Sequence, residues 1–285
     1  MPNSRRKPPP PPAPPASPNR RKPVLTAKSA DRHDLYERSV QTPDVEIAFI
    51  DRVYTRLRKK KPLRLREDFC GTAWMACEWV KHRPANTALG LDLDEAVMTW
   101  GTARHAESLT PEQCSRLDIR NCNVLTPPSA KVDVIAALNF SYFIFRERAT
   151  LCRYFQQCRR TLAPGGLLFL DFMGGSDCQT KVTERTRQRG FTYVWEHAAF
   201  DPISSHTTCK IHFEFPRGPA IKNAFVYHWR LWSITDIREL LAQAGFKTSR
   251  VFLEGDGANG KGDGTFRETR TGDPDRSFVG YVVAG

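Results

Sequence analysis

The chain has 285 residues, 40% of them hydrophobic, and a formal net charge of +12, which suffices for one large or two small packed domains. It lacks the run of about 18 apolar residues that crosses a bilayer, and no apolar run follows its basic N-terminus, so we expect neither a spanning helix nor a secretory signal. Eight cysteines without a C-x-x-C pair argue against a disulfide scaffold, zinc binding and dithiol chemistry. We therefore expect a cytoplasmic protein with reduced thiols, no metal and no membrane association.

Residues 1–30 form a basic, proline-rich tail. They hold ten of the 21 prolines, seven Lys or Arg and no acidic residue, so the other 255 residues carry only +5. Because the tail lacks large apolar side chains, we expect it to be disordered with polyproline II character. Its prolines exclude the amphipathic helix of a transit peptide. A contact with nucleic acid through the basic residues stays an alternative to a solubilising role.

From residue 31 onward, short apolar runs alternate with longer amphipathic ones, which predicts an α/β domain over residues 31–285. Residues 31–62 should form an N-terminal helical cap, because apolar residues recur at helical spacing over 44–58. Four strand and helix units should follow and build a parallel, doubly wound sheet. The expected strands are 63–69, 87–93, 132–138 and 166–172, with helices starting near residues 73, 95 and 148.

The pattern changes after Gly175. Aromatic-rich extended segments over 175–233 predict an antiparallel β insertion, with strands at 191–200, 207–215 and 222–232. Ser233 and Asp236 then resemble a capping box that opens one more helix, and Gly245 is placed to end it. Two closing strands are expected on either side of a Gly-rich loop, at 248–253 and 278–283.

The segment LREDFCGTA, residues 65–73, places a tight turn of small residues between a strand and a helix, where backbone amides approach a bound ligand. Glu67 and Asp68 end that strand. Asp92 ends the next strand about twenty residues later, the spacing at which a carboxylate in a βαβ unit binds a ribose. We therefore expect an adenosine compound. The turn has no G-x-G-x-x-G and the chain no Tyr-x-x-x-Lys, so hydride transfer is disfavoured.

EDFCGTA resembles the first motif of the class I S-adenosylmethionine-dependent methyltransferases, which usually reads like LDLGCGTG. Cys70, Gly71 and Thr72 match its core, whereas Phe69 and Ala73 replace two glycines. The resemblance implies S-adenosyl-L-methionine as cofactor and a Rossmann-like, doubly wound, seven-stranded sheet, mostly parallel with the last strand antiparallel. The cofactor-binding residues that it implies are Glu67, Asp68, Phe69, Cys70, Gly71, Thr72, Ala73, Asp92, Leu93, Asn123, Val124 and Asn139.

Further motifs follow in the family's order over about nine-tenths of the chain, up to LAPGGLLFLDF before the fifth strand. In GLDLD, Asp92 falls where relatives bind the ribose hydroxyls and Leu93 where they flank the adenine. In NCNVL, Asn123 occupies the position that receives the adenine amino group, with Val124 beside it. Asn123 is also a typical turn residue.

The acidic residues have structural interpretations as well. Glu67 and Asp68 could pair with Arg64 and Arg66, whose place in a strand that should be buried on both faces needs a partner. Asp92 could instead cap the helix that follows it. The basic run that contains both arginines, residues 56–66, is expected to be a solvated face, because it precedes the first strand and lies away from the ligand-binding edge.

The acceptor side is harder to place. Asn139-Phe140-Ser141-Tyr142 resembles the NPPY motif of amino-methyltransferases without its prolines, so we place Asn139 on the cofactor side and Tyr142 in the acceptor pocket or in the core. Alternation along FVYHWRLWS separates Tyr227 and Trp229 from His228 and Arg230. The sulfonium is an activated leaving group, so a dedicated base is not required. Candidate bases are Tyr142, Asp171 and His228, and candidate acceptor contacts are Tyr142, Tyr227, Trp229 and Arg230.

The sequence therefore predicts methyl transfer to an N or O atom of a small-molecule acceptor. An RNA or protein acceptor, or a non-catalytic adaptor that keeps the fold, are the alternatives. GDGANGKG, residues 255–262, is expected to be a plain loop rather than a phosphate-binding one, because no Ser or Thr follows its lysine. Nothing in the sequence specifies an oligomeric state.

Overall fold

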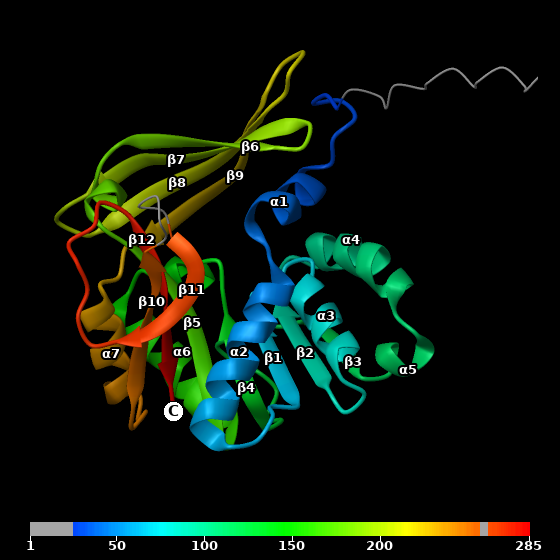
Figure 1. Ribbon diagram of the computed structural model, residues 1–285, viewed down its shortest axis with the longest axis vertical. Helices are drawn as coiled ribbons and strands as arrows, with labels where there is room; N and C mark the ends of the chain where they lie inside the picture. Colours follow the sequence, from blue (N-terminus) through cyan, green and yellow to red (C-terminus); the bar gives the residue numbers. More distant parts are fainter. Residues whose placement is uncertain (1–24, 257–261) are drawn as a thin grey trace, which may run out of the picture.

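The computed structural model describes residues 25–256 and 262–285 (Figure 1). Most of the expected tail and of the segment 255–262 thus lies outside the described residues. Within the described part, no helix is both long and apolar enough to cross a membrane.

A large sheet forms the centre of the molecule, in the order β11-β10-β12-β5-β4-β1-β2-β3. Strands β3, β2, β1, β4 and β5 are parallel, and β12 is antiparallel to both β5 and β10. This confirms the doubly wound α/β class with an antiparallel last strand. The strands are β1 (Arg64–Asp68), β2 (Thr87–Asp92), β3 (Leu117–Asn121), β4 (Val132–Ala137), β5 (Leu162–Gly174), β10 (Ser249–Asp256), β11 (Gly262–Thr269) and β12 (Phe278–Ala284).

Strand β11 makes the sheet eight-stranded rather than seven-stranded. It pairs antiparallel with β10 at the sheet edge, in the stretch that we expected to be loop between the closing strands. Its sequence GDGTFRET has two glycines, and most of its residues are exposed. Strands of this kind carry no alternation of apolar residues, so pairing with β10 decides the outcome rather than local propensity.

Helices cover both faces of the large sheet (Figure 1). On one face, α2, α3 and α4 pack through residues such as Ile50 and Trp79, and on the other α6 and α7 pack through residues such as Phe155 and Leu241. The helices are α1 (Arg32–Val40), α2 (Pro43–Arg58), α3 (Trp74–His82), α4 (Glu95–His105), α5 (Pro111–Cys114), α6 (Arg148–Thr161) and α7 (Ile234–Gln243), with 3-10 turns η1 (Ala106–Ser108), η2 (Ser141–Ile144) and η3 (Ser176–Gln179).

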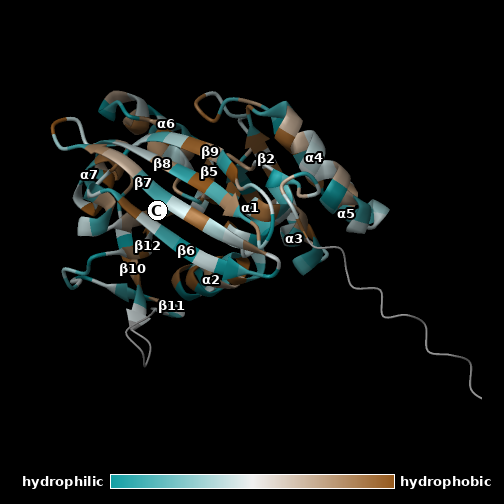
Figure 2. Ribbon diagram, turned by 90° about the horizontal axis from the view of Figure 1, so that it is seen from above, coloured by the Kyte–Doolittle hydropathy of each residue, from teal (hydrophilic) through white to brown (hydrophobic). Residues whose placement is uncertain are grey.

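Strand β5 leads through η3 into a second sheet, which we call the insertion sheet. Its four strands are antiparallel in the order β6-β7-β8-β9, which confirms the expected β insertion. Viewed from above, these strands lie across the end of the large sheet (Figure 2). The sequence did not predict β6, an exposed edge strand of mostly polar residues. The strands are β6 (Val182–Gln188), β7 (Phe191–Asp201), β8 (His206–Glu214) and β9 (Ile221–Arg230).

Helix α1 connects the insertion sheet to the rest of the molecule. The Asp31 carboxylate caps it by accepting from the backbone amides of His33 and Asp34. Leu35 is fully buried and packs with Phe191 and Phe213 of the insertion sheet. The N-terminal helices therefore help to hold the insertion sheet over the ends of the parallel strands.

Candidate cofactor and acceptor site

The turn between β1 and α3 has an uncommon backbone. Phe69, Gly71 and Ala73 have φ of 59°, 53° and 54°, the left-handed region that costs a residue with a Cβ about 1 kcal/mol or more. A Cβ added at Gly71 would meet only Val97 Cγ1, at 3.7 Å, so this side of the turn is open. Two non-glycine residues held in this conformation mark the turn as a candidate ligand site.

Asp92 lies directly beside this turn. One carboxylate oxygen accepts from the Gly71 amide at 2.8 Å, and the other accepts from the amides of Leu93 and Asp94 at 2.7 and 2.9 Å. The structure thus brings together the two segments that the sequence singled out. Asp92 does not cap α4, because Asp94 does so through the amides of Ala96 and Val97.

Helix α4 packs closely against the centre of this turn. Cys70 and Thr72 are buried, and α4 passes so close that a Cβ at Gly101 would lie 2.1 Å from the Thr72 carbonyl oxygen. Gly101 is therefore a supporting residue that the sequence argument missed. The signal for it was a glycine inside an otherwise regular helical pattern, which is tolerated where backbones approach closely.

The adenine side of the expected site is partly formed. Leu93 is 63% exposed immediately after Asp92, which leaves its side chain free to cover a flat ligand. Val124 is buried. Asn123 is exposed, and its side-chain oxygen accepts from the Leu125 amide at 2.9 Å, which makes it a turn residue as well as a candidate ligand contact.

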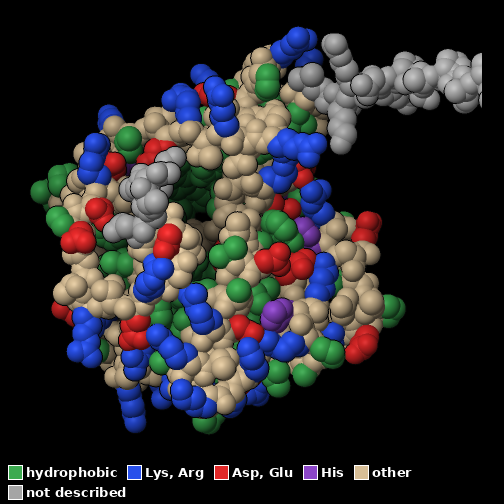
Figure 3. Space-filling model, viewed as in Figure 1, with side chains coloured by type: hydrophobic (Ala, Val, Ile, Leu, Met, Phe, Trp, Pro, Cys, Tyr) green, Lys and Arg blue, Asp and Glu red, His purple; other side chains and the backbone are tan. Residues whose placement is uncertain are grey.

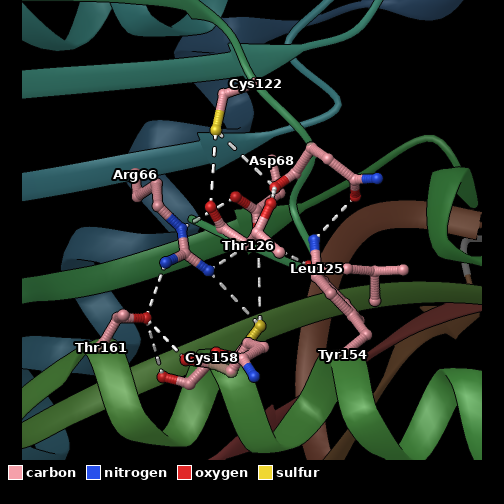
Figure 4. A network of polar contacts seen from close by, with 10 residues as sticks. Arg66, Asp68, Cys122, Leu125, Thr126, Tyr154, Cys158 and Thr161 are labelled. Carbon is pink, nitrogen blue, oxygen red and sulfur yellow. Dashed lines mark hydrogen bonds and ion pairs between the residues drawn. The ribbon is translucent and has the colours of Figure 1, made fainter. Parts of the chain in front are cut away.

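Asp68 does not face this site, which corrects its assignment as a cofactor contact (Figure 4). Its side chain is fully buried, 2.8 Å from Arg66 Nε, and it accepts from the Tyr154 hydroxyl at 2.8 Å. Arg66 also donates to Thr161 Oγ1 at 2.6 Å. The structural interpretation is thus correct for Asp68, because a buried arginine in a central strand requires a charged partner.

Arg66 also corrects the expectation that the whole basic run is solvated. It is 0% exposed, whereas Arg64 is exposed and pairs with Asp133 at 2.7 Å. Both side chains point to the same face of β1, but Arg64 is the first residue of the strand and is exposed, whereas Arg66 lies inside it and bonds to Thr161 and Cys158 of α6.

Three carboxyl groups lie near the carboxyl ends of β1 and β5. Burial raises the pKa of Glu67 to about 8, although its carboxylate accepts from the Ala76 amide at 2.9 Å. Burial likewise raises the pKa of Asp171 to about 8 and that of Glu46 to about 7. Glu46, on α2, adds to the rise of both other pKa values by like charge. In the described chain none of the three forms a salt bridge, so the site favours a cationic ligand.

A cavity of about 210 Å³ lies between the ends of β4 and β5 and the insertion sheet. Asn139 and Phe140 line it from β4, and Met173 lines it from β5. Tyr227 and Trp229 line it from β9, as the sequence predicted for acceptor contacts, and Tyr36 of α1 lines it as well. Figure 3 shows a hollow between the two sheets, with hydrophobic side chains in its depth. Tyr36 lies within the helical cap expected over residues 31–62, but the sequence offered no signal that its side chain reaches this cavity.

Asp171 supports the cavity from behind. Its carboxylate accepts from the backbone amides of Asn139 and Phe140 at 2.6 and 2.9 Å. Both residues have positive φ, of 58° and 56°, so these two bonds hold a strained turn at the cavity wall. Asp171 thus positions Asn139 and Phe140.

Three expected acceptor residues do not line the cavity. Tyr142 is fully buried and donates to the Asp171 carbonyl oxygen at 2.7 Å, so it is a core residue. His228 is exposed and bonds to Thr208 Oγ1, and Arg230 donates to the Arg146 carbonyl oxygen. Because Tyr227 and Trp229 face the cavity, strand alternation turns residues 228 and 230 away from it.

Comparison with known proteins agrees with this geometry. Residues 68–170 match the family model described as a methyltransferase domain. By sequence, no curated protein matches the chain. The match contains the turn, Asp92, Asn123 and Asn139.

Several solved structures share the fold. A S-adenosylmethionine-dependent methyltransferase from Clostridium acetobutylicum has a TM-score of 0.64 at 13% identity and covers 88% of this chain and 96% of its own. CalS10, an amino pentose methyltransferase from Micromonospora echinaspora, has a TM-score of 0.59 at 14% identity and covers 87% and 95%. The sugar N-methyltransferase KedS8 from Streptoalloteichus has a TM-score of 0.55 at 20% identity and covers 91% and 96%.

Residues 68–170 thus match a methyltransferase domain, and the chain shares the α/β fold of these solved methyltransferases. The first of these structures is described as S-adenosylmethionine-dependent, and CalS10 is described as bound to S-adenosylmethionine.

Proposed function

We propose that the protein methylates an N or O atom of a small-molecule acceptor bound in the 210 Å³ cavity. The observation that carries this proposal is the placement of Asn139. It follows β4 beside the proposed cofactor site, and it also lines the cavity. In this proposal residues 31–62 and the insertion at 175–233 form the substrate side of a methyltransferase domain that spans residues 31–285.

The residues around the turn fit the cofactor. S-adenosylmethionine has a sulfonium and an ammonium group, and the carboxyl groups near the turn have no cationic partner in the described chain. Glu67 would lie near these charges, Asp92 would accept from the ribose hydroxyls and Leu93 would cover the adenine. Cys70, Thr72 and Ala73 would shape the turn, with Asn123 and Val124 at the adenine edge. When bound, the cofactor supplies an activated methyl group.

The protein's part in the reaction is then positioning. Asp171 fixes the turn of Asn139 and Phe140, and that turn would hold the acceptor in line with the methyl group. Strands β7 and β9 of the insertion sheet form one wall of the cavity. The names of CalS10 and KedS8 describe methyl transfer to sugars, and a glycopeptide N-methyltransferase, MtfA, shares the fold at a TM-score of 0.53. These names support a small, polar acceptor.

The experiment is transfer of a labelled methyl group. The purified full chain is incubated with methyl-labelled S-adenosylmethionine and, separately, with small amines, hydroxylated small molecules, total RNA or a denatured protein mixture. We expect label in a small-molecule product and a loss of that label in Asn139→Ala. Label that enters only RNA or protein would contradict the proposed acceptor class.

A further inference from the structure

Six aromatic side chains lie among the fifteen described residues that line the cavity under the insertion sheet. Tyr227 and Trp229 are stacked, with ring centroids 4.4 Å apart and an interplanar angle of 22°. Trp195 lies 6.2 Å from each of them. Tyr36, Tyr193 and Phe140 complete the aromatic lining. Rings from α1, the turn after β4 and two strands of the insertion sheet, β7 and β9, thus meet around one space.

The same cavity has no cationic side chain. The chain contains 43 Lys and Arg, yet none of the described ones lines it. Its one acidic lining residue is Glu184, which lies opposite Trp195 across the β6 and β7 pairing. Asp171 adds a second carboxyl group directly behind the wall that Asn139 and Phe140 form. An anionic ligand would therefore find no cationic partner among the described Lys and Arg residues.

His197 adds no positive charge to the lining. It is 6% exposed, and burial lowers its pKa, which keeps the imidazole neutral. Its Nε2 accepts from Trp195 Nε1 at 2.9 Å, and its Nδ1 lies 3.6 Å from Cys209 Sγ. Both ring nitrogens are thus engaged, and His197 orients the Trp195 indole rather than acting on a ligand.

The negative face of an aromatic ring attracts cations, and several rings around one desolvated space attract them together. We propose that this cavity recognises the methyl acceptor as a small alkylammonium ion, held by the rings of Tyr227, Trp229 and Trp195 with Glu184 at its edge. The proposal rests on the proposed function and names its substrate class as an amine. Before transfer the bound ammonium ion would lose a proton to water, so that the nitrogen lone pair forms the new bond to the methyl carbon while the methyl–sulfur bond breaks and its electrons stay on sulfur. A cavity of about 210 Å³ has the volume of roughly seven waters, which suits an ammonium head group.

The test compares a cation with its neutral isostere. Choline and 3,3-dimethylbutan-1-ol have the same shape and differ by the charge on one atom, and both are titrated into the full chain in the presence of S-adenosylhomocysteine. We expect choline to bind at least about tenfold more tightly than the alcohol. Equal or tighter binding of the alcohol would show an ordinary apolar pocket and overturn the proposal.

Variants of β9 distinguish the contribution of the Tyr227 ring to choline binding from an effect on folding. Tyr227→Phe keeps the ring and should keep choline binding within about threefold, whereas Tyr227→Leu should weaken it at least about tenfold. His228→Ala, on the opposite face of the same strand, is the matched control and should change nothing. Equal choline affinity in Tyr227→Leu and in the unmodified protein would contradict the proposal.

Binding of S-adenosylhomocysteine is measured on the same samples. If it binds with normal affinity to a variant that has lost choline, the variant is folded and the loss belongs to the acceptor cavity. If it binds and choline does not bind the unmodified protein, the amine proposal fails while the methyltransferase function stands. If choline binds and S-adenosylhomocysteine does not, the proposed function fails and the cation site stands.

Discussion

At the scale of single residues, Phe69 is the clearest departure from the glycine-rich methyltransferase motif that residues 67–73 resemble. Its φ of 59° suits glycine, but its side chain packs in the core: the centroid of its ring lies 5.8 Å from that of the Phe145 ring and 5.9 Å from that of the Tyr154 ring. Phe69→Ala should lose the ring and keep the strain, whereas Phe69→Gly should lose the ring and release about 1 kcal/mol of strain. In urea unfolding we expect the glycine variant to be more stable than the alanine variant by about that amount.

We also expect Phe69→Gly to retain or tighten binding of S-adenosylhomocysteine. A glycine variant with clearly weaker binding would show that the phenyl ring serves the cofactor.

Asp92 is the residue on which the ribose assignment depends. Replacing it with alanine removes the proposed acceptor of two hydroxyl groups and leaves the Gly71 amide without its partner. We expect Asp92→Ala to weaken S-adenosylhomocysteine by about 10- to 100-fold in calorimetry, since each hydrogen bond to a charged group contributes about 1.5–3 kcal/mol. Asp118→Ala, which removes an exposed carboxylate on β3, is the control. Unchanged affinity in Asp92→Ala would disprove the assignment.

At the scale of elements, the buried pair of Arg66 and Asp68 links β1 to α6 (Figure 4). Arg66→Met leaves the Asp68 carboxylate buried without its cation, so we expect a loss of about 3–5 kcal/mol in the free energy of unfolding. Arg64→Met removes the exposed partner of Asp133 and should cost under about 1 kcal/mol. Equal losses in the two variants, measured by urea unfolding, would mean that the buried network does not stabilise this contact.

The carboxyl groups contributed by β1, α2 and β5 predict a dependence of stability on pH. The pKa of Glu67 rises from 4.5 to about 8, so folding favours its protonated form. Its contribution to stability is then fully present below about pH 4.5 and is lost as the pH rises through about 8. We expect Glu67→Gln, which keeps an oxygen for the Ala76 amide, to gain stability over the unmodified protein between pH 5 and 8. The free energies of unfolding of the two proteins, plotted against pH, should diverge by a few kcal/mol at most. Parallel curves would contradict the raised pKa of Glu67.

The elements also show what the sequence could predict. The buried strands of the large sheet and helices such as α2 and α6 carried strong periodicity, and the structure has them within a few residues of the predicted bounds. Strands β6 and β11 could not be predicted, because they are exposed edge strands whose pairing depends on β7 and β10. Helix α1 lies within the helical cap expected over residues 31–62, but its bounds could not be predicted, because only Leu35 and Glu37 of its residues are buried, which leaves no apolar stripe.

The residues of the candidate site also divide into those that the sequence could place and those that it could not. Asp92 and the turn at 69–73 could be placed together because consecutive parallel strands end at one edge of a sheet. Glu46 and Tyr36 could not, since their helices reach the site only through tertiary packing. Alternation in β1 puts Asp68 on the face of Arg66, so the sequence allowed the pairing that the structure shows, but it did not show that this pairing buries Asp68 away from the site.

At the scale of the whole molecule, the insertion sheet and α1 enclose a cavity at the ends of β4 and β5, and the turn of Asn139 and Phe140 links this cavity to the proposed cofactor site (Figures 1 and 3). We thus place the proposed cofactor site at the carboxyl ends of β1 to β4 and the proposed acceptor site beneath the insertion sheet. This division explains why the acidic groups and the aromatic groups gather at the same end of the large sheet.

The measurement that tests the account most directly is calorimetric titration of the purified full chain with S-adenosylhomocysteine, with NAD as the control ligand. If the proposed methyltransferase function is correct, we expect micromolar binding of S-adenosylhomocysteine with one site per chain and no measurable heat with NAD. Absence of S-adenosylhomocysteine binding, or equal binding of NAD, would contradict it and would favour an adaptor that keeps the fold without the cofactor.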